Sequence, residues 1–508
     1  MSEKGKSHLT LFAMIASTLF SKALGLCRSM LLAWTLGDLP EAAAFAAASK
    51  IPGAVFDLLF SAAIAGTFIP LYGEARQKGV QCARSFARAF FGACLAAASA
   101  LALAGALFAP QVMAITAPSL GAETARLSAR LLRIMFPSTV FAAGVYTLSG
   151  LMQSHGGFIL PAAVSAFSNL FIIAYLLFSG ARFSVYGLSL AYVFSWGLQF
   201  FSLALPLILK GRFPLPQLGF RTPLLRKAVL RAPRVMACSW LAPASALAAA
   251  FFCSFVSDAA LVLYDYASGI YTIAAGVAVY GVGNYVFPAL AALYAEGNLP
   301  LFAKEVQKAV FSALTVAFPV FCAVAVLAGD AVSLLYAHGN FSADAAHACA
   351  RALLALSPAI PAFAVSEILY RAFCAAGKTK APVSASLTAL AVLFPSGALF
   401  LAAHGGLTGI CAALAASQWA HALFLIFAAK KHFGVNALAK TPFLVLCSAL
   451  CFAVMSLLAQ NLPFFSQVAP SISIFLKITI VFTIGIVVYL YIYYIGFLRP
   501  NQLRKRKR

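Results

Sequence analysis

The segment ARLLRIMFPS (residues 129–138) recurs later in the chain as ARALLALSPA (residues 350–359). We call the distance in sequence between residues 129 and 350 the main repeat spacing. The same spacing aligns Gly156 with Gly377. A weaker match, at a slightly shorter spacing, sets FIPLYGEARQKG (68–79) against VFPALAALYAEG (286–297). Because prolines and glycines coincide along with the apolar residues, we interpret the matches as two copies of one structural unit.

The composition places both copies in a membrane. The 508 residues are 63% hydrophobic and 10% charged, and the mean hydropathy is +0.94. Soluble domains carry about 25% charged residues. Apolar runs long enough to cross a bilayer recur throughout, without the short alternating segments of a β-barrel. We therefore predict an all-α polytopic membrane protein, whose first apolar segment is a retained helix and not a cleaved signal peptide.

Polar, glycine and proline residues divide the apolar sequence into about 14 predicted transmembrane helices. Several are longer than the roughly 20 residues that a crossing needs, which predicts tilted or kinked helices. The predicted spans are 8–36, 41–72, 80–114, 122–152, 158–180, 184–209, 228–257, 260–293, 301–328, 345–376, 381–403, 406–429, 441–460 and 470–497.

The main repeat spacing covers six predicted helices, an even number, so both copies have the same orientation in the membrane. Parallel repeats of this kind build two-lobed transporters. We predict an N-terminal six-helix lobe with a basic loop over residues 1–222 and a C-terminal six-helix lobe over residues 223–435. Residues 436–508 are predicted to add two further transmembrane helices and a basic tail.

The distribution of Lys and Arg predicts the topology. The formal net charge is +23, and most of the 36 basic residues fall in alternate loops. Such loops face the cytoplasm, which predicts a multi-pass membrane protein with both termini inside. The basic surplus is then a topology signal that also attracts anionic phospholipids, and no nucleic-acid partner is expected.

Three cations lie inside the first two predicted helices. Lys22 and Arg28 occur in SKALGLCRSMLLAWTLGD (residues 21–38), and Lys50 precedes Pro52, where we expect the second helix to bend. A cation within the bilayer costs about 2.5–3.5 kcal/mol on insertion scales and typically faces a water-filled cavity. We predict that Lys22, Arg28 and Lys50 bind an anionic substrate. The alternative is that their side chains reach the membrane interface.

Five residues are secondary candidates for the cavity or for gating. Asp57 and Asp265 are acids within apolar spans, and Ser29 follows Arg28. Glu367 and Arg371 are four residues apart on one predicted helix, which favours an ion pair. The other cations outside the cytoplasmic loops are expected to reach the interface: Arg126, Arg130, Arg133, Arg182, Arg351 and Lys477.

Signatures of catalysis are absent from the sequence. GKT at residues 377–379 resembles the end of a phosphate-binding loop, but Ala372 stands where that loop needs a glycine. No HExxH motif or Cys/His cluster with metal-ligand spacing occurs. We therefore predict a transporter, not an enzyme, with no cofactor or metal, driven by an ion gradient or the membrane potential.

Several segments resemble the MurJ/MviN family of lipid II flippases, within the MOP exporter superfamily. The matching segments are SKALGLCR (21–28), AFAAASKIPG (44–53), AGTFIPLYGEARQKG (65–79) and the long stretch over residues 335–383 that begins LYAHGNFSADA. The resemblance implies a cationic cavity that receives the diphosphate of lipid II, the undecaprenyl-linked peptidoglycan precursor. The lobes then rock by alternating access and move it from the inner to the outer leaflet. Such a role implies a location in the bacterial plasma membrane and suggests cell-wall synthesis proteins as partners.

The resemblance also implies particular residues and shows departures. Arg28 matches the essential first-helix arginine of the family, while Lys22 and Lys50 stand at two further basic positions. Four positions lack the usual charged residue of the family: Ser29, Ala43, Phe56 and Gly269. The chain is thus a divergent member, for which two alternatives stay open. These are a small-molecule antiporter of the multidrug (MATE) branch and a non-transporting scaffold of cell-wall synthesis.

Overall fold

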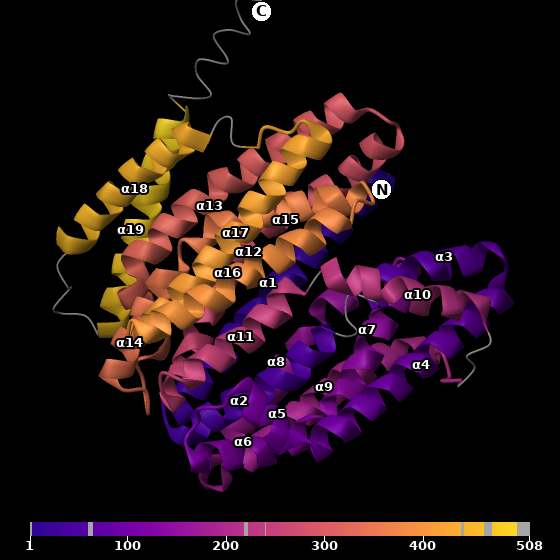
Figure 1. The fold of residues 1–508 in the computed structure, drawn as a ribbon, viewed down its shortest axis with the longest axis horizontal. Coiled ribbons are helices and arrows are strands. Elements are labelled where there is room, and N and C mark those ends of the chain that lie inside the picture. The colour runs from indigo at the N-terminus through magenta and orange to yellow at the C-terminus, as the bar shows by residue number, and fades with distance from the viewer. Residues whose placement is uncertain are drawn as a thin grey trace, which may run out of the picture. The chain divides into compact units, whose positions relative to one another are not determined.

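A computed structural model describes residues 3–58, 64–217, 222–238, 240–437, 441–461 and 470–494. Within these ranges the regular structure is helical, with no strand. The chain divides into two compact units, Met1–Val262 and Leu263–Arg508, called here the N-terminal and C-terminal units. Figure 1 shows the long helices of each unit lying alongside one another. The predicted division at residues 222 and 435 rests on the repeat and stays a prediction.

The N-terminal unit is built from consecutive helices. They are α1 (Glu3–Leu36), α2 (Pro40–Phe56), the π-helix η2 (Ile64–Phe68), α3 (Ile69–Gln77), α4 (Val80–Leu107), α5 (Ala109–Thr116), α6 (Ala122–Met135), α7 (Ser138–Ser154), α8 (Ile159–Phe178), the short 3₁₀ turn η3 (Gly180–Arg182), α9 (Val185–Leu209), α10 (Pro223–Cys238) and α11 (Leu241–Ser254). Helix α12 (Asp258–Ala295) begins at the end of this unit and continues into the next.

The C-terminal unit continues with longer and less interrupted helices. They are α13 (Leu299–Tyr336), α14 (Ala343–Leu356), α15 (Ala359–Ala375), α16 (Lys380–Ala402), α17 (Gly406–Phe433), α18 (Thr441–Asn461) and α19 (Pro470–Tyr493). Its core lies around α13, with side chains from α15, α17, α18 and α19 packed on it.

Helix boundaries repeat at the main repeat spacing. The first residues of α6, α7, α8 and α9 align at this spacing with the first residues of α14, α15, α16 and α17, respectively. The bend between α6 and α7 is 44°, and that between α14 and α15 is 45°. Pro137 and Pro358 lie at these two bends, where a proline lacks the N–H that would continue the helix.

Glycines end the second helix of each bent pair in the same way. Gly156 follows α7 with φ of 81°, and Gly377 follows α15 with φ of 66°. A positive φ at the end of a helix is costly for residues with a Cβ atom and suits glycine. The two copies therefore share their bends and their helix ends, as the aligned sequence motifs indicate.

The copies differ in the second helix. At the shorter spacing, α12 matches the whole stretch from the start of α2 to the end of α3, and α12 is α-helical throughout, whereas residues 57–58 and 64–68 are π-helical. The helix α2 runs through Pro52 to Phe56, and the bend that we expected at Pro52 stays a prediction. The indole of Trp240 donates a hydrogen bond to the carbonyl of Leu58 (3.1 Å). This bond gives the Leu58 carbonyl a partner from a residue remote in sequence.

The π-helix η2 is held by aromatic packing. The Phe68 ring lies 4.9 Å from that of Phe90 and 5.8 Å from that of Phe86, both on α4. Phe68, Phe86 and Phe90 belong to the hydrophobic core of the N-terminal unit. Single π turns inside helices occur frequently at functional sites, which directs attention to the end of α2.

The membrane-spanning character agrees with the sequence prediction. Among the described residues, nine helices are long and apolar enough to cross a membrane, or eleven if each bent pair is one span. Each corresponds to one predicted span. The three remaining predicted spans, 41–72, 228–257 and 260–293, coincide with α2 to α3, α10 with α11, and α12. The all-helical multi-span fold is confirmed, while the number 14 stays a prediction.

Helices α18 and α19, drawn in yellow in Figure 1, pack side by side and against α13. Lys477 on α19 pairs with Asp330 on α13 at an Nζ–Oδ2 distance of 3.0 Å. We expected Lys477 to reach the membrane interface, and this stays a prediction; the structure adds an ion pair with an acid on the neighbouring helix. The two side chains are only 17% and 20% exposed, so the ion pair is largely shielded from water.

Replacing Lys477 with methionine should destabilise the protein, because Asp330 keeps its charge in a poorly hydrated place. Removing one member of a buried ion pair costs about 3–5 kcal/mol, and the residual exposure of this pair lowers our expectation to about 2 kcal/mol. The double variant Lys477→Met/Asp330→Leu should recover most of the loss. The check is thermal unfolding of the detergent-purified protein. Equal stability of the single variant and the original protein would contradict a stabilising role of the pair.

Candidate functional site

Small and polar residues pack the first helix, α1, against α8. The Nδ2 atom of Asn169 on α8 donates a hydrogen bond to the carbonyl of Ser21 (3.0 Å). A Cβ atom at Gly25 would lie 3.4 Å from the same nitrogen, an ordinary van der Waals contact, so α1 and α8 are directly packed at this position. This packing fixes the rotation of α1 and with it the positions of Lys22 and Arg28.

The predicted cations of α1 and α2 are partly or largely withdrawn from solvent. The Nε atom of Arg28 and the Nζ atom of Lys50 are buried, and Lys22 is half-buried. All three engage neighbouring groups. The Ser29 hydroxyl donates to the carbonyl of Gly25 in its own helix (3.0 Å), so it satisfies the backbone of α1. Buried cations in a membrane-spanning bundle are typical of a functional site.

Tyr192 on α9 connects the two helices that carry these cations. Its hydroxyl donates a hydrogen bond to the carbonyl of Ser49, the residue before Lys50 (3.4 Å). Both Arg28 and Asp57 act electrostatically on the same hydroxyl. The structure thus brings Arg28, Lys50 and Asp57 into the surroundings of one tyrosine.

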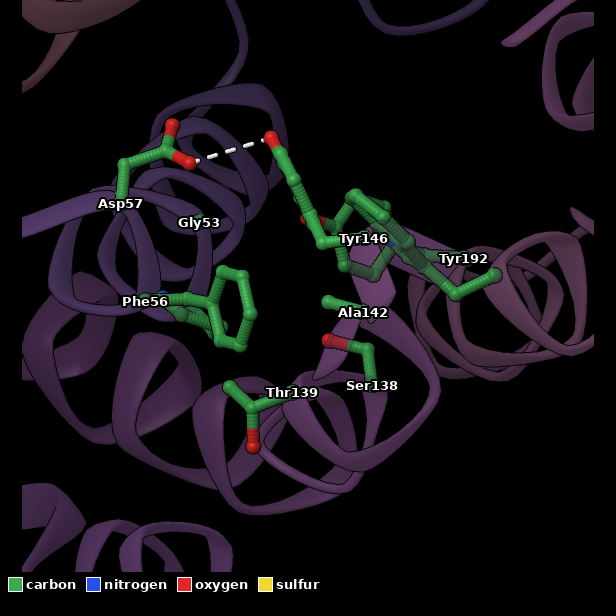
Figure 2. Close-up of a pocket in the computed structure, with 10 residues that line it drawn as sticks. Gly53, Phe56, Asp57, Ser138, Thr139, Ala142, Tyr146 and Tyr192 are labelled. Atoms are coloured by element: carbon green, nitrogen blue, oxygen red, sulfur yellow. Dashed lines mark hydrogen bonds between the residues drawn. The ribbon is translucent and has the colours of Figure 1, made fainter. Parts of the chain in front are cut away.

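Asp57 lies at the C-terminal end of α2. The hydroxyl of Tyr146 on α7 donates to its Oδ1 atom at 3.1 Å, as Figure 2 shows. The Phe56 ring packs against that of Tyr146 with centroids 5.3 Å apart. A cavity of about 40 Å³ lies here, and both Tyr192 and Trp196 contribute to its wall.

A second and larger cavity, of about 400 Å³, shares Tyr146 and Trp196 with the first. It lies among α3, α7, α8 and α9, and its lining residues carry no formal charge. The polar groups in its wall include the amides of Gln153 and Gln199 and the hydroxyl of Ser149. The N-terminal unit therefore has a charged region around Tyr192 and a neutral polar cavity next to it.

The other predicted site residues belong to the C-terminal unit. Arg371 and Glu367 on α15 form the expected ion pair, with an Nε–Oε1 distance of 2.9 Å. Asp265 lies on α12, where the Ser268 hydroxyl donates to its backbone carbonyl (3.1 Å). Their roles in a cavity or in gating stay predictions.

Sequence reasoning missed several residues of the two cavities. Tyr146, Tyr192, Trp196 and Gln199 are uncharged and lie in apolar helices, where such residues are common. The repeat offered a signal, since the aligned residues of the second copy differ in chemistry: Glu367, Ala413, Ser417 and Ala420. The cations also have uncharged counterparts at the shorter spacing: Trp240, Ala246 and Ser268. Buried cations therefore occur at these positions in the first copy and not in the second.

An all-helical chain of repeated units with buried cations between apolar helices defines a polytopic membrane transporter. Residues 32–483 match the family model described as Lipid II flippase MurJ, and the chain belongs to this family. The membership confirms the predicted family and a flippase, not an enzyme. It also confirms a multi-pass membrane protein of a bacterial flippase family.

Two relatives illustrate the degree of divergence. The probable lipid II flippase MurJ of Rhizobium meliloti is 26% identical over 481 residues, covering 89% of this chain and 87% of the relative. The probable lipid II flippase MurJ of Buchnera aphidicola subsp. Baizongia pistaciae is 29% identical over 186 residues. That match covers 36% of this chain and spans only 36% of the relative.

Solved structures support the fold. A lipid II flippase MurJ in an inward closed conformation superposes with a TM-score of 0.79 at 20% identity, covering 96% of this chain and 99% of that structure. An inward-facing multidrug resistance MATE transporter of the MOP superfamily gives a TM-score of 0.69 at 15% identity, covering 84% and 98%. These likenesses concern the fold and do not bear on the site.

Proposed function

We propose that this chain moves lipid II, or a close polyprenyl-diphosphate relative, from the inner to the outer leaflet of a bacterial plasma membrane. Lys22, Arg28 and Lys50 hold the diphosphate. The observation that carries this assignment is the burial of the Arg28 and Lys50 nitrogen atoms in the first two helices of a chain from the flippase family.

The chemistry of these side chains suits a diphosphate. The guanidinium of Arg28 presents a planar set of donors that matches phosphate oxygens, and each Lys adds a compact positive charge. In a poorly hydrated region these interactions are stronger than in water. The diphosphate in turn supplies the negative charge that this divergent chain lacks at Ser29, where the family resemblance leads us to expect an acid.

The transport cycle we propose is alternating access powered by an ion gradient or by the membrane potential. The chain carries no nucleotide-binding motif for another source of energy. Asp57 lies at the C-terminal end of α2, the helix that carries Lys50, and a group that gains or loses charge there would change the local balance of charge. Its hydrogen bond from Tyr146 makes it the first residue to test for coupling.

The orientation we propose places both termini and the basic loops in the cytoplasm, following the positive-inside rule. One such loop leads into α10, where Lys227 pairs with Glu74 of α3 at an Nζ–Oε2 distance of 2.6 Å. The hydrogen bond from Lys227 lowers the pKa of the Glu74 carboxyl. The excess of cations at this face would attract anionic phospholipids.

The proposed function is tested with fluorescent lipid II in proteoliposomes of the purified protein. We expect the inner-leaflet pool of labelled lipid to become accessible to an external quencher or enzyme only when the protein is present. A labelled phosphatidylglycerol is the matched lipid control. Absence of lipid II movement, with correctly inserted protein, would favour the scaffold alternative, and movement of small cations instead would favour the antiporter.

A further inference from the structure

The cavity of about 400 Å³ in the N-terminal unit has the composition of a binding site for an uncharged polar group. Its volume falls within the roughly 300–1,000 Å³ typical of small-molecule sites. The amides of Gln153 and Gln199 can each donate and accept hydrogen bonds, as can the hydroxyls of Ser149 and Ser165. The rings of Tyr146 and Trp196 add flat apolar faces. Sugar rings need this combination, because they present hydroxyls at their edges and C–H groups on their faces.

The second copy of the fold shows that this lining is dispensable for folding. At the main repeat spacing, Gln153 aligns with Cys374 and Gln199 with Ala420, while the helix starts coincide. The amide of Gln418 in the second copy instead bonds the Ser366 hydroxyl (3.4 Å). The same bundle thus forms without amides at these positions, so their presence in the first copy needs another explanation.

The position of the cavity relative to the cations matches the order of groups in the proposed substrate. The cavity shares Tyr146 and Trp196 with the smaller cavity beside Asp57, and Tyr192 in that smaller wall is within electrostatic reach of Arg28. In lipid II the diphosphate is bonded directly to the first sugar. A head group with its diphosphate at the cations therefore has its sugars next to the neutral cavity.

We infer that this cavity binds the carbohydrate part of the lipid-linked head group, with Gln153 and Gln199 as the residues that recognise its hydroxyl or amide groups. This inference rests on the proposed function and adds a subsite to it. The subsite gives the flippase a way to distinguish a loaded carrier from the bare polyprenyl diphosphate.

The experiment compares binding of three probes to the purified full chain in nanodiscs, by native mass spectrometry. The probes are lipid II, the same molecule without its peptide, and undecaprenyl diphosphate. For Gln153→Leu/Gln199→Leu we expect about tenfold weaker binding of both sugar-bearing probes, the effect of losing two neutral hydrogen bonds. Binding of undecaprenyl diphosphate should change less than about twofold. Gln77→Leu, at an exposed position on α3, is the matched control and should change none of the three.

The outcomes separate the inference from the proposed function. If the double variant binds all three probes equally more weakly, or binds none of them more weakly, the sugar subsite is overturned. The proposed function still stands in that case, provided that the original protein binds lipid II. Weakening confined to the peptide-bearing probe also overturns the subsite. If the original protein neither binds nor moves lipid II, the proposed function fails and the subsite with it. Should the double variant unfold, Gln153→Leu alone decides, because Gln153 is only half-buried.

Discussion

Cells that depend on this protein as their sole flippase should stop growing when Arg28 is replaced with alanine. Arg28 combines a buried nitrogen atom with an electrostatic effect on Tyr192. Charge-assisted hydrogen bonds contribute about 1.5–3 kcal/mol each, so losing even one lowers diphosphate binding by about 10- to 150-fold. The measurement is growth after depletion of the resident flippase, with the protein level followed by immunoblot.

Two further variants make this result specific. Arg28→Lys keeps the charge but loses the planar pair of donors, so we expect partial growth. Arg126→Ala removes an exposed arginine of α6 and should grow normally. Normal growth of Arg28→Ala at normal protein levels would show that Arg28 does not hold the substrate. Failure of Arg126→Ala would show that any loss of arginine in this unit is harmful.

The repeated architecture could be predicted because its signals are local in sequence. Pro137 and Pro358 lack the N–H that would continue the preceding helix, and Gly156 and Gly377 allow a positive φ regardless of their surroundings. A pair of such residues at one spacing therefore indicates the same bend twice. The matching bends of 44° and 45° follow from these residues.

The change from α-helix to π-helix after α2 could not be predicted in the same way. The local signal, Pro52, lies inside a helix that continues past it. The carbonyl of Leu58 is satisfied by the indole of Trp240, which is remote in sequence. The pairing of Lys477 with Asp330 is equally non-local. Both features depend on which helices become neighbours, and periodicity along one helix does not carry that information.

The candidate site was predictable in its charges and not in its neutral residues. Lys22, Arg28 and Lys50 stand out because a cation in an apolar helix is costly and therefore rare. Tyr192 and Gln199 carry no such cost, and their importance appears only when α9 is placed beside the other helices. Comparison of the two copies of the repeat identifies Tyr192 and Gln199. Residues that both copies share maintain the fold, whereas residues that differ between the copies are candidates for function.

The loop between α9 and α10 crosses α4 at Gly92 so closely that no side chain fits between them. A Cβ atom at this position would lie 2.5, 2.8 and 2.9 Å from the O, C and N atoms of Gln217. These are backbone atoms, and the Gln217 N–H is itself bonded to the carbonyl of Arg88 (3.2 Å). The loop is further held by Phe213, whose ring packs edge-on against that of Phe91. The segment from Phe213 to Gln217 therefore has little freedom to move away from α4.

Gly92→Ala should consequently be among the most destabilising single-methyl changes in the chain. Overpacking costs about 1–3 kcal/mol and occasionally more, and contact with fixed backbone puts this case at about 3 kcal/mol. The intrinsic preference of helices for alanine offsets at most about 1 kcal/mol of it. The matched control is Gly73→Ala on α3, where a Cβ atom meets nothing within 4 Å and alanine should be neutral or stabilising. Thermal unfolding of both variants in one detergent separates the two effects. Equal melting temperatures would contradict the prediction, because they would mean that the loop moves away from α4 in spite of its hydrogen bond and its aromatic contact.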